Sequence, residues 1–120
     1  MNEQQSYIRY QNALIHQYRE RINHAESDQD LKRMYFQIMK DLFIDIFEDD
    51  LGLEFHHIDL LPNTEPFFCL DLKIAEHPRM QAALEHSDIQ SILSNFARQA
   101  CHHLLHLQRH PENTESRISL

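Results

Sequence analysis

The stretch that decides the fold is DQDLKRMYFQIMKDLFIDIFED, residues 28–49. Its apolar side chains recur at spacings of three and four, the period of one face of an α-helix. Placed at about 100° per residue, a broad apolar face consists of Leu31, Met34, Tyr35, Ile38, Met39, Leu42 and Ile46. A second apolar ridge beside it consists of Phe36, Phe43 and Phe47. Together, the apolar face and the phenylalanine ridge are wider than the apolar stripe of about 100° that is usual for a surface helix. We therefore expect a helix that is central to the core or that forms a homodimer through the phenylalanine ridge.

Another helix is expected before this stretch, over residues 5–25, where tyrosine and aliphatic side chains share the same spacing. Ser27 followed by Asp30 resembles a capping box, in which the serine side chain accepts a hydrogen bond from the backbone three residues later. The central helix is therefore expected to begin near Asp28, and Gly52 is expected to end the helical run.

Two more helices are expected towards the carboxyl terminus. Pro78 suits the first position of a helix, because the N–H that proline lacks would have no intrahelical partner there. The short helix that it opens is predicted over residues 78–86. Ser87 with Gln90 resembles a second capping box, which predicts the start of a long helix over residues 88–110.

The segment between the two helical pairs has a different period. Apolar residues at alternate positions from Phe68 to Ile74 are typical of a half-buried strand, predicted over residues 67–74. Residues 53–61 are a weaker strand candidate, and LPNTEP at 61–66 is typical of a turn. The predicted fold is mostly α (α+β): two amino-terminal helices, a small antiparallel β-hairpin, then a short and a long carboxyl-terminal helix. The alternative is an all-α bundle, in which this segment is loop and short helix.

Length and composition limit the class of protein. The chain has 120 residues, of which 42% are hydrophobic and 25% charged, values that fit one modest core. We expect residues 1–111 to form a single compact domain and residues 112–120 to form a flexible tail. No apolar run approaches the roughly 20 residues that cross a bilayer, and the polar start MNEQQSYIRYQ lacks a secretory apolar segment. A cytoplasmic location is therefore expected, with Cys69 and Cys101 as free thiols.

Known catalytic and cofactor motifs are missing from the sequence. With Gly52 as its one glycine, the chain contains neither GxGxxG nor GxxxxGK[ST], the loops that bind nucleotide phosphates. It also contains no serine nucleophile elbow and no HExxH. We therefore expect a protein that is not an enzyme and that requires no cofactor.

The negative charge is concentrated in one part of the chain. The formal net charge is −8, and residues 41–72 contain nine acids without a single Lys or Arg. Such a field repels nucleic acid and steers association with a basic surface. A solvated acidic face that keeps the protein soluble is the alternative interpretation.

The sequence therefore suggests an acidic protein-binding regulator or inhibitor, of an immunity type or a nucleic-acid mimic. Its carboxylates would cover a basic surface of a nucleic-acid-binding protein or toxin, with hydrophobic contacts fixing the register. The candidate partner-binding residues are Asp41, Asp45, Glu48, Asp49, Asp50 and Glu54. No direct contact with nucleic acid or membrane is expected.

Histidines provide an alternative function. The chain has ten of them, and His102, His106 and His110 follow one another at spacings of four, so that neighbouring pairs can point two imidazoles at one metal ion. Histidine in the last turn of a helix is also explained by its favourable interaction with the helix dipole. The alternative is thus a histidine-rich metal-binding protein.

An enzymatic alternative rests on a resemblance. FHHIDLLPN at residues 55–63, followed by ACHHLLHLQRH at 100–110, resembles the His–Asn–His (HNH) family of metal-dependent nucleases. The resemblance implies His57 as general base and His102 and His106 as metal ligands. The chain lacks the family's glycine after the first motif and its supporting CxxC pairs.

Overall fold

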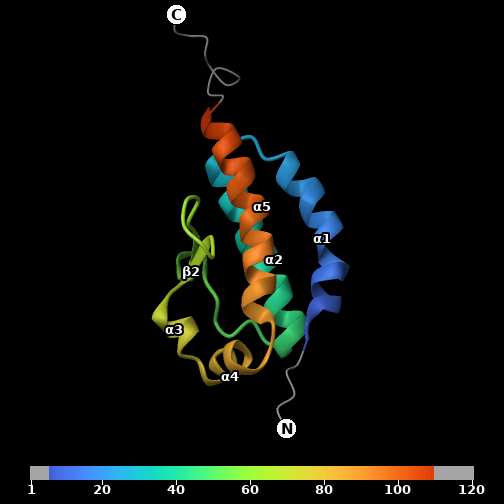
Figure 1. The fold of residues 1–120 in the computed structure, drawn as a ribbon, viewed down its shortest axis with the longest axis vertical. Helices are drawn as coiled ribbons and strands as arrows, with labels where there is room; N and C mark the ends of the chain where they lie inside the picture. Colours follow the sequence, from blue (N-terminus) through green and yellow to red (C-terminus); the bar gives the residue numbers. More distant parts are fainter. Residues whose placement is uncertain (1–5, 110–120) are drawn as a thin grey trace, which may run out of the picture.

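A computed structural model describes residues 6–109 (Figure 1). The helices α1 (Ile8–Asn23) and α2 (Asp28–Phe47) form an antiparallel pair, and α5 (Ile89–Arg109) packs against both. A two-stranded antiparallel sheet, α3 (Leu72–Ala75) and α4 (Pro78–His86) complete this part of the chain. The predicted mostly α (α+β) fold is confirmed, and the all-α alternative is wrong because the hairpin forms.

The core is built around α2. Leu31, Met39, Leu42 and Phe43 of this helix are fully buried, each 0% exposed. Phe43 and Phe47 pack edge to face, with ring centroids 5.8 Å apart. The predicted homodimer ridge of Phe36, Phe43 and Phe47 is therefore wrong as a surface, because two of its three rings lie inside the monomer core. Phe36 is half-buried and packs against Phe55.

The two ends of α2 are set by different residues. At the start, the Ser27 hydroxyl accepts a hydrogen bond from the Asp30 N–H at 3.1 Å, which confirms the predicted cap. At the end, the helix stops at Phe47, and Glu48 adopts the left-handed conformation with φ 60°. The prediction that Gly52 ends the helix is therefore wrong. Gly52 has φ +74° in the following turn, where its N–H donates to the Asp50 carboxylate at 2.9 Å.

The hairpin is shorter than predicted. A turn of 3-10 helix, η1 (Phe55–His57), leads into β1 (Ile58–Leu60), which pairs with β2 (Phe68–Leu70) so that Asp59 faces Cys69. The Glu65–Pro66 peptide bond in the turn between the strands is cis.

The second half of the predicted strand over 67–74 is wrong, since residues 72–75 form α3. The Asp71 side chain caps this helix by accepting a hydrogen bond from the Lys73 N–H at 3.4 Å. Helical geometry then buries Ile74 and leaves Leu72 67% exposed, although a strand would place these two residues on the same face.

The last two helices agree with the sequence. The short helix α4 has the predicted bounds, with Pro78 at its first position. Before α5, the Ser87 hydroxyl accepts from the Ile89 N–H at 3.1 Å and not from the Gln90 N–H of the predicted capping box, and the helix starts at Ile89 instead of Asp88. The Asp88 carboxylate accepts from the Ser6 hydroxyl and the Tyr7 N–H, both at 2.8 Å, and so fixes the start of α1 against the start of α5. His110 and the predicted flexible tail 112–120 lie outside the described residues.

Candidate functional site

Three of the six predicted binding residues form one edge of α2. Asp41, Asp45 and Glu48 lie within about 60° of one another around the helix axis, at about 100° per residue. Asp45 and Glu48 are exposed and Asp41 is half-buried. None of the three takes part in an ion pair with any residue between 6 and 109. The carboxylates on this edge are therefore available to a binding partner.

The other three predicted residues follow α2 and differ from one another. Asp49 is exposed and, within the described part of the chain, has no ion pair. Asp50 lies 3.9 Å from Lys40 Nζ, in addition to holding the turn at Gly52. Glu54 caps η1, since its side chain accepts from the His57 backbone. Asp50 and Glu54 thus have structural roles that the sequence pattern did not indicate.

An apolar side chain lies among the acids of α2. Ile44 is 45% exposed and is one helical turn from both Asp41 and Glu48, with Asp45 beside it. The prediction missed it, although Ile44 is the one apolar residue of α2 that belongs to neither the broad apolar face nor the phenylalanine ridge. We define the acidic face as Asp41, Ile44, Asp45 and Glu48.

The partial negative charge at the carboxyl end of α2 is offset by a side chain from another helix. Its last turn contains no basic residue, and acids near a helix carboxyl terminus oppose the macrodipole. Arg79, at the start of α4, donates to the Phe47 carbonyl oxygen at 2.5 Å and lies 5.6 Å from the centre of the Phe47 ring. This cation offsets the partial negative charge of the helix end, whereas the carboxylates of the acidic face stay without an ion pair among residues 6–109.

The histidines of α5 are not assembled into a metal centre. His102 and His106 are exposed, and His103 Nε2 lies 3.3 Å from the Ala25 carbonyl oxygen. Over the described residues, no three His, Cys, Asp or Glu side chains are grouped so that they could hold a metal ion. His110, the third predicted ligand, is outside that range. His57 is buried and accepts the Glu54 N–H at its Nδ1, at 2.9 Å. The geometry therefore does not combine His57, His102 and His106 into the site that the nuclease resemblance implies.

Comparison with protein-family models, with curated proteins and with solved structures finds no match for this chain. Over the described residues, no helix combines the length and the apolar character that a membrane span requires.

Proposed function

We propose that this chain is a non-enzymatic binding protein that covers a basic surface of a partner protein. The single observation that carries the proposal is the acidic face of α2, where an exposed isoleucine lies among three carboxylates without an ion pair in the described structure. Protein interfaces combine an apolar contact at the centre with polar groups around it. Ile44 would supply the apolar contact, and Asp41, Asp45 and Glu48 the charged rim.

Charge determines which partner this face suits. The acidic face lies in a segment of nine acids without Lys or Arg, so its field attracts a cationic surface and raises the rate of encounter with it. A nucleic-acid-binding protein or a toxin that acts on nucleic acid presents such a surface. The carboxylates would occupy positions that phosphates take, which makes the chain an inhibitor of the immunity or nucleic-acid-mimic type. The two free thiols fit a reducing compartment such as the cytoplasm.

The experiment is affinity capture with the full chain, followed by affinity measurement with the isolated partner. Between about 50 mM and about 500 mM salt the Debye length falls from roughly 14 Å to roughly 4 Å. We expect the affinity to fall steeply over this range. Unchanged binding would rule out the electrostatic mechanism.

A matched pair of variants tests whether binding depends on the acidic face or on the total charge of the protein. The triple variant Asp41→Asn, Asp45→Asn and Glu48→Gln removes three negative charges from the acidic face. The control variant Glu20→Gln, Glu26→Gln and Glu76→Gln removes the same charge from exposed positions on other elements. The first variant is expected to weaken binding by at least about tenfold, and the control to change it little. Equal loss in both variants would show that overall charge, and not this face, binds the partner.

A second variant tests the apolar contact. Ile44→Asp keeps the fold, because the side chain is 45% exposed in the free protein, but it places a charge at the proposed interface centre. Central apolar residues of interfaces contribute about 2 kcal/mol or more, so binding should become at least about thirtyfold weaker. Unaltered affinity would remove Ile44 from the contact.

A further inference from the structure

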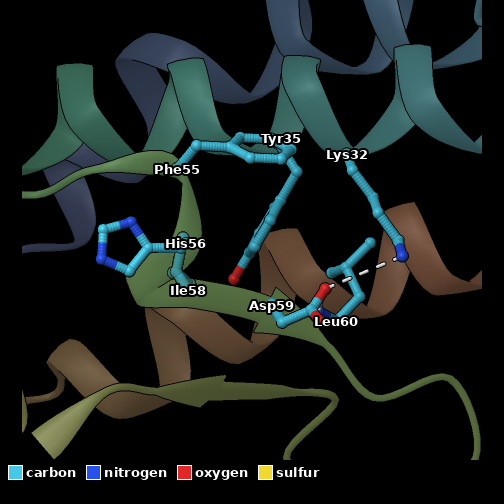
Figure 2. Close-up of a pocket in the computed structure, with 7 residues that line it drawn as sticks. All are labelled: Lys32, Tyr35, Phe55, His56, Ile58, Asp59 and Leu60. Carbon is cyan, nitrogen blue, oxygen red and sulfur yellow. Dashed lines mark hydrogen bonds and ion pairs between the residues drawn. The ribbon is translucent and has the colours of Figure 1, made fainter.

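A pocket of about 290 Å³ lies between α2 and the hairpin strand β1 (Figure 2). It is lined by Lys32, Tyr35, Phe55, His56, Ile58, Asp59 and Leu60. The volume lies at the lower end of the range of roughly 300 to 1,000 Å³ that small-molecule pockets span, so the pocket suits a single ring-sized molecule. No residue of the acidic face lines the pocket, so the pocket is separate from that face.

The Tyr35 hydroxyl is an unpartnered hydrogen-bond donor that lies buried beneath the lining of this pocket. The residue is 1% exposed, and its hydroxyl oxygen has no hydrogen-bond partner among residues 6–109. Figure 2 shows the phenol extending from α2 towards β1, with the hydroxyl between Ile58 and Asp59. Buried polar groups in folded proteins are nearly always paired, and an unpaired one destabilises the fold. A bound molecule would satisfy this hydroxyl with its own acceptor, provided that the side chains lining the pocket move apart and uncover the oxygen.

Three of the residues that line the pocket, Phe55, Ile58 and Leu60, are apolar. The Phe55 side chain is 51% exposed, and its ring is supported by an edge-to-face contact with Phe36 at 5.6 Å. Ile58 and Leu60 of β1 are buried and add aliphatic surface. Exposing so much of an aromatic ring to water is unfavourable, and a flat apolar group placed against it would remove that surface from solvent.

The charged groups of the pocket offset each other. Lys32 Nζ lies 3.9 Å from the Asp59 carboxylate, joined by the dashed line in Figure 2. A charged ligand would give up its hydration without meeting a net opposite charge, which is costly. Burial, together with the negative charge of the nearby Asp59 carboxylate, raises the pKa of Tyr35 well above its ordinary value, so the hydroxyl stays protonated and able to donate.

We propose that the pocket between α2 and β1 opens locally around the Tyr35 hydroxyl and binds a neutral, ring-sized molecule whose acceptor receives the hydrogen bond of that hydroxyl. The ring lies against Phe55 and the aliphatic side chains of β1, and the acceptor is a carbonyl oxygen or a ring nitrogen. This binding site is independent of the proposed partner-binding function, which uses a different part of α2.

The test uses four probes of similar shape on the full chain: benzamide, benzoate, benzylamine and toluene. Binding is followed by amide chemical-shift changes in two-dimensional NMR. Benzamide, which is neutral and carries a carbonyl acceptor, is expected to bind most tightly, with a dissociation constant on the order of 1 mM for a ligand of this size. Its shift changes should be centred on Lys32, Phe55 and Ile58 to Leu60.

Single-residue variants test whether the Tyr35 hydroxyl donates a hydrogen bond to the bound molecule. Tyr35→Phe keeps the ring and removes the hydroxyl, so benzamide should bind about five- to tenfold more weakly, while toluene binding is unchanged. Tyr18→Phe is the matched control: it removes a hydroxyl that is already paired with the Phe96 carbonyl oxygen, outside the pocket lining. It should leave benzamide affinity as it is. If Tyr35→Phe does not fold, Phe55→Ala tests the same pocket at an exposed position and should weaken both benzamide and toluene.

Several results would overturn the proposal. These are no shift changes with benzamide, shift changes centred outside the pocket, tightest binding by benzoate or benzylamine, and equal benzamide affinity in the wild type and Tyr35→Phe. Loss of partner binding in the acidic-face variant would not affect this test, because its residues do not line the pocket.

Discussion

The two fully buried tyrosines differ in whether the hydroxyl group has a hydrogen-bond partner. Tyr18 on α1 and Tyr35 on α2 are each 1% exposed. The Tyr18 hydroxyl donates to the Phe96 carbonyl oxygen of α5 at 2.7 Å, and the two rings pack edge to face at 5.0 Å. Within the described structure, the Tyr35 hydroxyl has no partner.

The difference separates burial from hydrogen-bond satisfaction. Packing against apolar neighbours removes both rings from water to the same extent, but only the α1–α5 contact places a carbonyl oxygen where a hydroxyl needs one. Beside the hairpin, half of the other residues in the pocket lining are apolar, and none of the polar ones pairs with the Tyr35 hydroxyl. The Tyr18 region is therefore closed core, whereas the Tyr35 region keeps an unused donor at a pocket.

Alkaline pH should unfold the protein through both tyrosines. Burial, with a smaller contribution from Cys101, raises the pKa of Tyr18 well above 10.0, and burial likewise raises the pKa of Tyr35. Because these folded-state pKa values exceed the unfolded ones, the stabilisation is complete below about pH 10 and is lost as the pH rises towards the folded-state values. Between the unfolded-state and folded-state pKa values, each buried tyrosine lowers the free energy of unfolding by about 1.4 kcal/mol per pH unit. Phenolate absorbance of Tyr18 and Tyr35 should therefore appear together with the loss of helical circular dichroism. Full ionisation of all four tyrosines with the helical signal intact would contradict this prediction.

Thiol labelling should distinguish the interior from the hairpin surface. Cys101 is buried near both tyrosines, and burial raises the pKa of its thiol to about 11, whereas Cys69 is exposed. At about pH 8 a thiol with that pKa is roughly one-thousandth thiolate, the reactive form. Iodoacetamide should modify Cys101 at least about a hundredfold more slowly than Cys69. The single-thiol variants Cys69→Ser and Cys101→Ser identify each rate, and labelling in denaturant provides the control. Similar rates in the folded protein would show that the interior is open.

Removing the Tyr18 hydroxyl should destabilise the fold. Tyr18→Phe deletes the hydrogen bond to Phe96 and leaves the ring contact in place. A buried hydrogen bond of this kind contributes about 1 to 2 kcal/mol to the free energy of unfolding. Chemical denaturation monitored by circular dichroism measures the change. An unaltered midpoint would mean that this hydroxyl is no better satisfied than that of Tyr35.

Removing the Tyr35 hydroxyl should have the smallest effect. Because no hydrogen bond is lost within the described structure and a buried unpaired hydroxyl is removed, Tyr35→Phe should leave the free energy of unfolding unchanged or raise it by up to about 1 kcal/mol. The same denaturation experiment applies, with Tyr18→Phe beside it. A loss as large as that of Tyr18→Phe would show that the Tyr35 hydroxyl is bonded in solution.

Local signals predicted the helices well. The Ser27 cap gave the start of α2, and Pro78 gave α4, because each signal acts within one helical turn. The alternation from Phe68 to Ile74 misled, since the Asp71 cap turned its second half into α3. The spacing of apolar residues alone did not indicate that the second half of this stretch forms a helix and not a strand.

The site was less predictable. The acids of α2 were visible in the sequence, yet Asp50 and Glu54 acquire structural roles only through the turn and η1. The pairing of the Tyr35 hydroxyl depends on which atoms distant segments bring to it, and a hydrophobic pattern contains no such information. The same holds for Arg79, whose partner on α2 is 32 residues away.

That last contact has a consequence for how the molecule opens. The Phe47 carbonyl oxygen receives its hydrogen bond from a side chain of α4, so the final turn of α2 and the start of α4 are joined. Amide hydrogens of the two segments should therefore exchange with solvent deuterium as one cooperative unit. Any event that displaces α4 would fray the end of α2, and the acids that follow Phe47 would change position with it.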